Sequence, residues 1–106
     1  MTIDKLNELK TEAKPLIGSD IIISKEISPN KTEFIQCVFV DINENAVEKF
    51  DSDEENKMSY SPRAILKEKE SHDTYDRFPL EYVINAIKRE RNIHWDFFKE
   101  YKKQNN

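Results

Sequence analysis

The sequence predicts a single α+β domain over residues 1–106: an N-terminal helix, an antiparallel β-meander of two to four strands, and C-terminal helices packed on one face of the sheet. Apolar residues recur at helical spacing near both ends of the chain, whereas the stretch from 20 to 42 is rich in β-branched and aromatic residues. The connections between these stretches are short, which favours antiparallel over parallel pairing. A chain of 106 residues, 37% of them hydrophobic, is long enough to bury one core.

The first predicted element is an amphipathic helix that begins after Thr2. A threonine at this position can cap the free N–H groups of the first turn. Pro15 disfavours helical backbone at the residue before it, so we expect the helix to end near Lys14 and Gly18 to carry the chain around a turn. The side chains expected to face the core are Ile3, Leu6, Leu9, Ala13, Leu16 and Ile17.

A β-hairpin is predicted next, with strands over residues 21–27 and 34–42. Pro29 and Asn30 lie between them and suit the second and third positions of a type I turn. The second strand is apolar at both odd and even positions, so we expect it to be central in the sheet and covered on both faces.

An acidic segment follows the hairpin. Residues 41–56 contain seven carboxylates and one lysine, a net charge of −6, although the whole chain carries only −4. Residues 46–50 and 57–60 either form two short strands joined by an acidic tip, or the whole segment 43–60 is a mobile loop; its few apolar residues do not decide between these alternatives.

Helices are predicted for most of the remaining chain. Ser61 is a favoured cap and is followed by proline, which predicts a short helix over 62–70. Residues 71–76 are polar and are expected to form a loop. The longest helical pattern runs from 79 to 103, either as one helix or as two that break at Asn92.

The composition excludes several classes of function. Gly18 is the only glycine, so the glycine-rich loops that bind phosphates and dinucleotides cannot be built. His72, His94 and Cys37 lack the spacing of metal ligands, and no catalytic motif is present. We therefore predict a protein that is not an enzyme and that has no metal and no cofactor.

The same composition indicates where the protein works. Cys37 cannot form an intrachain disulfide and lies in a predicted strand, which fits a buried thiol in a reducing compartment. The N-terminus does not resemble a signal peptide, and no apolar run approaches the length of a membrane span. We expect a cytoplasmic protein that has no contact with membranes. An excess of lysine over arginine, 13 to 4, is typical of AT-rich bacterial or phage genomes.

Charge asymmetry gives the leading prediction of function: a protein-binding module, such as an inhibitor, an immunity protein or a regulatory adaptor, whose acidic surface meets a partner with a basic surface. The predicted partner-binding residues are Glu44, Glu48, Asp51, Asp53, Glu54 and Glu55. One alternative is a nucleic-acid accessory protein that uses Lys88, Arg89, Arg91, Lys99, Lys102 and Lys103. Another is a small phage assembly component that associates through exposed rings of Tyr82, Trp95, Phe97 and Tyr101.

Overall fold

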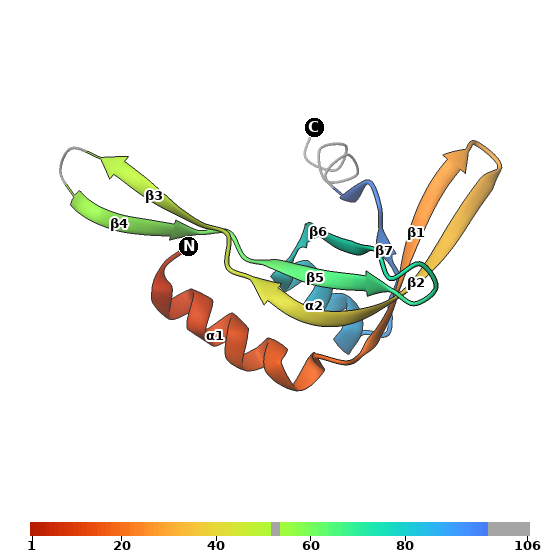
Figure 1. Cartoon of the computed structure of the whole chain (residues 1–106), viewed down its shortest axis with the longest axis horizontal. Coiled ribbons are helices and arrows are strands. Elements are labelled where there is room, and N and C mark those ends of the chain that lie inside the picture. The colour runs from red at the N-terminus through yellow and green to blue at the C-terminus, as the bar shows by residue number, and fades with distance from the viewer. Residues whose placement is uncertain (52–53, 98–106) are drawn as a thin grey trace.

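Five strands in the order β6-β5-β2-β1-β7 form the central sheet of the protein. The structure is a computed structural model that describes residues 1–51 and 54–97, and of residues 48–51 and 54–57 it describes the backbone alone. All neighbouring strands are antiparallel except β7, which runs parallel to β1. The bounds of the strands are β1 Asp20–Ser28, β2 Lys31–Asn43, β5 Arg63–Glu68, β6 Thr74–Pro79 and β7 Ile93–His94 (Figure 1).

The N-terminal helix is confirmed. α1 (Ile3–Ala13) begins after Thr2, whose side-chain oxygen accepts a hydrogen bond of 3.2 Å from the backbone N–H of Lys5. A short 3-10 helix, η1 (Lys14–Leu16), follows it, because Pro15 fits the start of a 3-10 turn. Gly18 then adopts a φ of +99°, a conformation in which a side chain would be strained, and leads the chain into β1.

The predicted hairpin is also confirmed, as the antiparallel pair β1 and β2. β2 lies between β1 and β5, so it is central, as expected. The prediction that both of its faces are covered is wrong. Ile35, Cys37 and Phe39 are buried, whereas Gln36 is exposed and Val38 is half-buried. The helices cover only the face to which the odd-numbered residues point.

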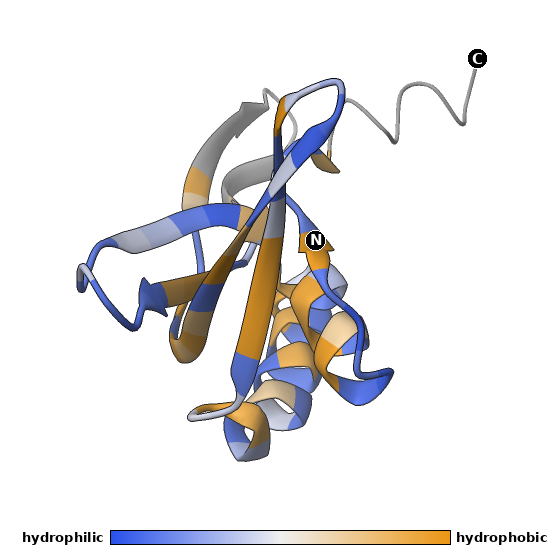
Figure 2. Cartoon of the chain, turned by 90° about the vertical axis from the view of Figure 1, so that its right-hand side faces the viewer, coloured by the Kyte–Doolittle hydropathy of each residue, from blue (hydrophilic) through white to orange (hydrophobic). Residues whose placement is uncertain are grey.

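The core lies between this face and the helices α1 and α2 (Leu80–Lys88). Alternate residues of β1, β2 and β5 contribute to it, as the two-residue period of a strand requires, and β6 and β7 contribute Phe78 and Ile93. Hydrophobic residues accordingly lie in the middle of the strands and on the helices beside them, and hydrophilic residues predominate near the hairpin ends (Figure 2). The largest fully buried side chains are Phe39, Phe78, Leu6, Ile23, Leu66, Leu80, Ile84 and Ile93.

The predicted antiparallel meander with C-terminal helices is wrong. The stretch expected to form a helix over 62–70 contains strand β5, and part of the expected loop over 71–76 belongs to β6. Both strands form because each finds a backbone partner: β5 pairs with β2 on one side and with β6 on the other. Within the described part of the helical pattern from 79, α2 ends at Lys88, and β7 then adds a parallel edge strand to give a mixed sheet.

A second, two-stranded sheet is formed by β3 (Ala46–Asp51) and β4 (Glu54–Tyr60), so of the two alternatives for this segment the strands are correct. We call residues 46–60 the β3–β4 arm. β2 and β5 last pair at Asn43 and Arg63, and β3 and β4 resume pairing at Ala46 and Tyr60. The arm is therefore an extension of the β2–β5 pair that projects away from the five-stranded sheet (Figure 1).

Candidate functional site

The β3–β4 arm carries most of the predicted partner-binding residues. Glu48 and Asp51 belong to β3, and Glu54 and Glu55 belong to β4. The backbones of Asp51 and Glu54 form the last pair of the ladder, next to the turn. The structure therefore brings these four positions onto one projecting element. Asp53 lies outside the described residues.

Glu44 has a different place from the other predicted residues. It lies in the connection between β2 and β3, and its carboxylate forms an ion pair with Lys10 of α1, with 2.5 Å between Nζ and Oε1. The backbone N–H of Tyr60 also donates a hydrogen bond of 3.3 Å to the carbonyl of Met1. Together these contacts join the base of the arm to α1 and to the residues before it.

The chain turns from β2 into β3 at Asn45, which adopts a φ of +47°. Asparagine tolerates this left-handed conformation better than most residues. Its backbone N–H donates a hydrogen bond of 2.9 Å to the side-chain oxygen of Asn43, which closes a local turn. The arm therefore leaves the sheet through a two-residue connection, 44–45, that a local hydrogen bond closes.

The basic residues predicted to bind nucleic acid do not form one described surface. Lys88 is ion-paired with Glu12 of α1. Arg89 and Arg91 lie at the end of α2, where no carboxylate of the described residues comes within ion-pair distance of either. Lys99, Lys102 and Lys103 lie outside the described residues.

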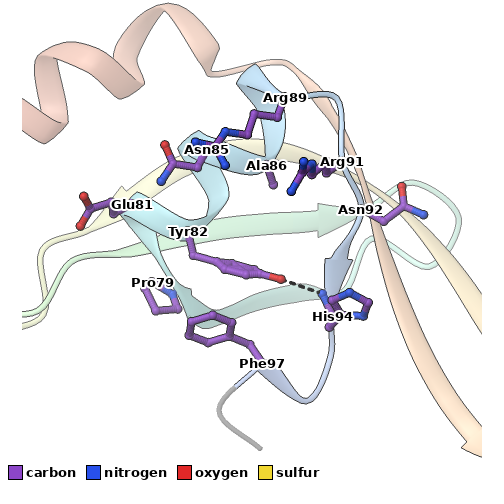
Figure 3. A pocket seen from close by; sticks show the side chains of 10 residues that line it. All are labelled: Pro79, Glu81, Tyr82, Asn85, Ala86, Arg89, Arg91, Asn92, His94 and Phe97. Atoms are coloured by element: carbon purple, nitrogen blue, oxygen red, sulfur yellow. Dashed lines mark hydrogen bonds between the residues drawn. The ribbon is translucent and has the colours of Figure 1, made fainter. Parts of the chain in front are cut away.

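A hollow of about 500 Å³ lies beside α2, and we call it the α2 hollow. Figure 3 shows Arg89 and Arg91 on one side of it and the ring of Tyr82 extending across it towards β7. The Tyr82 hydroxyl accepts a hydrogen bond of 3.1 Å from the backbone N–H of His94. The residues that line the hollow are Pro79, Glu81, Tyr82, Asn85, Ala86, Arg89, Arg91, Asn92, His94 and Phe97.

The backbone that presents the two arginines is fixed by a helix-capping motif. The N–H of Arg91 donates to the carbonyl of Ala86 over 2.8 Å, and the N–H of Glu90 donates to Ile87 over 3.2 Å. These are the two hydrogen bonds of a Schellman motif. Glu90 occupies the left-handed position of the motif, with a φ of +53°, where glycine is the usual residue.

Aromatic rings form a chain from β6 to the segment after β7. Trp95 meets Tyr75 edge to face, with 5.5 Å between ring centroids, and also contacts Phe78. Phe78 stacks on Tyr82, and Tyr82 contacts Phe97 with centroids 4.1 Å apart. The three described rings that were predicted to mediate self-association therefore pack against other rings of the same chain. Tyr101 lies outside the described residues.

Two cations lie over the Trp95 ring. The Arg77 guanidinium is 4.0 Å from its centroid and the Lys25 ammonium is 4.7 Å away. Such contacts stabilise a partly exposed indole by about 0.5–1 kcal/mol each. They explain why Trp95 stays on the sheet although it is only half-buried.

The structure places Cys37 and the potential metal ligands of the described residues, which the sequence predictions considered. Cys37 is fully buried. Burial, and to a smaller extent the nearby Glu68 carboxylate, raises the pKa of its thiol to about 11. An activated nucleophilic cysteine has a lowered pKa instead. No group of three or more His, Cys, Asp or Glu residues in the described part could hold a metal ion. No described helix is both long and apolar enough to cross a bilayer.

The α2 hollow was missed in the sequence analysis, although Arg89 and Arg91 were singled out. The paired arginines at the end of a helix were the available signal. Their proximity to Tyr82 and Phe97 depends on the turn after α2. The sequence analysis left open a break at Asn92, but it expected a second helix after that break, where the chain forms β7. No family model, curated protein or solved structure matches this chain.

Proposed function

We propose that the chain is a non-enzymatic protein-binding module that inhibits or regulates a partner with a basic surface, and that the β3–β4 arm is the element that binds. The observation that carries the proposal is the placement of charge. The arm contains five carboxylates and two lysines, a net charge of −3 on 15 residues, and it projects from the sheet (Figure 1). A projecting acidic element steers and orients a basic partner.

The packing of the arm supports the same proposal. Among the arm residues whose side chains are described, 46, 47 and 58–60, none belongs to the core cluster. Two apolar side chains of the arm, Val47 and Met58, are 57% and 41% exposed. Exposed apolar side chains among carboxylates give a surface that can combine steering with apolar contact. A partner interface is one use of such an element; the other is to keep the strand edges from pairing with further chains.

The test removes charge from the tip and compares it with the same loss of charge elsewhere. The tip variant is Asp53→Asn, Glu54→Gln and Glu55→Gln. The matched control is Glu8→Gln, Glu26→Gln and Glu33→Gln, three exposed carboxylates on α1 and the β1–β2 hairpin. A partner is first identified by crosslinking to the unchanged chain in extract of the native host, and its affinity for all three forms is then measured at two salt concentrations.

We expect the tip variant to bind the partner about tenfold or more weakly and with a smaller salt dependence, since about 1.4 kcal/mol shared over three charges gives a factor of ten. The control should change affinity less than about twofold. Equal affinities for the tip variant and the unchanged chain would show that the arm is not the interface. Equal losses of affinity in the tip variant and the control would show that the net charge of the chain, and not the position of the charges, determines binding.

A further inference from the structure

The α2 hollow differs in charge from the rest of the protein. The chain carries a net charge of −4, yet the hollow is lined by two arginines and one carboxylate, Glu81. Four described lysines form ion pairs with carboxylates of this chain: Lys5, Lys10, Lys69 and Lys88. Arg89 and Arg91 have none among the described residues, so their guanidinium groups are available to an anion from outside.

The backbone that carries the two arginines is also fixed. The Schellman hydrogen bonds at Glu90 and Arg91 fix the backbone on which both side chains are mounted. In Figure 3 the Arg89 side chain extends alongside Asn85, and Arg91 lies on the same side of the hollow. Planar guanidinium groups present paired N–H donors that match the oxygens of a phosphate.

The remaining lining is suited to a flat ring. Tyr82 and Phe97 are half-buried and in contact, and the Tyr82 ring extends across the hollow (Figure 3). Aromatic side chains of this kind stack on nucleobases. The Asn85 carboxamide also lines the hollow and offers a donor and an acceptor. A volume of about 500 Å³ lies within the range of small-molecule sites.

We propose that the α2 hollow binds a nucleoside phosphate, with the phosphate at Arg89 and Arg91 and the base against Tyr82 and Phe97. The ligand is either a free mononucleotide or the terminal nucleotide of a single strand, which share this chemistry. The negative charge of the whole molecule disfavours a long polyanion and favours the free nucleotide. This site is separate from the β3–β4 arm, so the nucleotide proposal can be tested independently of the proposed function.

The test is a titration of the full chain with adenosine 5′-monophosphate as the probe. Two-dimensional NMR spectra monitor the titration. Adenosine and inorganic phosphate are titrated separately. We expect the nucleotide to shift the signals of the hollow and to bind about tenfold or more tightly than either fragment, because it makes both sets of contacts. A short oligonucleotide with a terminal phosphate forms a further arm, and tighter binding at the same residues identifies the single strand as the source.

Variants locate the phosphate contact. Arg89→Ala with Arg91→Ala should weaken nucleotide binding by about tenfold or more, and the double lysine variant should lie between, because lysine keeps the charge but loses the paired donors. Arg63→Ala, a partly exposed arginine on β5, is the control for the loss of an arginine outside the hollow and should leave affinity unchanged. The proposal is overturned if the nucleotide shifts no signal of the hollow, if phosphate alone binds as well, or if Arg63→Ala causes the same loss.

Discussion

The Glu68 carboxylate accepts a hydrogen bond from the Tyr75 hydroxyl, with 2.7 Å between the two oxygens. This hydrogen bond is the main cause that raises the pKa of Tyr75 to about 12 from its usual 10.0. The same carboxylate adds to the effect of burial on the thiol of Cys37, whose pKa is raised to about 11 from 9.0. Glu68 of β5 thus raises the pKa of Tyr75 as the main cause and the pKa of Cys37 as the smaller of two causes.

These shifts predict that the protein loses stability at alkaline pH. Because the folded state holds both protons more tightly than the unfolded chain, the contribution to stability is complete below pH 9.0 and is lost as the pH rises through about 11 for Cys37 and about 12 for Tyr75. In Glu68→Gln the ring signals of Tyr75 should titrate at lower pH in NMR spectra, and the alkaline fall in the free energy of unfolding should be shallower. A titration of Tyr75 near its usual pKa in the unchanged chain would contradict the hydrogen bond.

At the scale of elements, the turn at the end of α2 places a non-glycine residue, Glu90, in left-handed backbone. Left-handed backbone costs an ordinary residue about 1 kcal/mol relative to glycine. Glu90 occupies this position at a φ of +53°, and His72 adopts +64° in the turn between β5 and β6. The near-absence of glycine therefore does not prevent left-handed turns in this chain. Strained backbone of this kind concentrates at functional sites, and Glu90 lies between the two arginines of the α2 hollow.

Replacing this residue should stabilise the protein. We expect Glu90→Gly to raise the free energy of unfolding by about 0.5–1 kcal/mol, because glycine relieves the strain while the Schellman hydrogen bonds remain. The measurement is equilibrium denaturation in urea. The control is Glu81→Gly, the same substitution in the first turn of α2, which should destabilise by about 1 kcal/mol. Destabilisation by both variants would mean that the Glu90 side chain makes a favourable contact that outweighs the strain.

At the scale of the whole molecule, the five-stranded sheet and the arm are separable parts. The sheet is held by the core cluster between its inner face and the two helices. The arm is held to the rest by the β2–β5 continuation, the Lys10–Glu44 ion pair and the Tyr60–Met1 hydrogen bond. An exposed ion pair contributes about 0–1 kcal/mol. Folding of the sheet should therefore not depend on the arm.

A chain in which residues 45–60 are replaced by Asn-Gly should fold with a melting temperature within about 5 °C of the parent, because a short turn suffices to join two antiparallel strands. Circular dichroism and the fluorescence of Trp95 measure this directly. The shortened chain should still bind the nucleotide probe at the α2 hollow and should lose the partner of the arm. Unfolding of the shortened chain would show that the arm contributes to the core.

Local signals in the sequence determined the helix and the hairpin of the first 42 residues, although Ile3 and Ile17, which were expected in the core, are 49% and 40% exposed. These signals are the Thr2 cap, the turn at Gly18 and the Pro29–Asn30 turn. Each depends on interactions between residues close in the sequence, so residue types and spacing suffice to predict it. The strand pattern over the acidic segment was visible too, but the choice between strands and a mobile loop needed the pairing of β3 with β4.

Only the tertiary structure decided the rest. Ser61 and Pro62 favour a helix locally, yet residues 63–68 form β5, because β2 and β6 supply backbone partners on both edges and burial of Ala64 and Leu66 outweighs helix propensity. The parallel pairing of β7 with β1 joins residues about 70 positions apart. The same long-range packing creates the α2 hollow, because the turn after α2 returns the chain past Tyr82. A break at Asn92 was open from the sequence, but the pairing with β1 that makes β7 a strand is not a local signal.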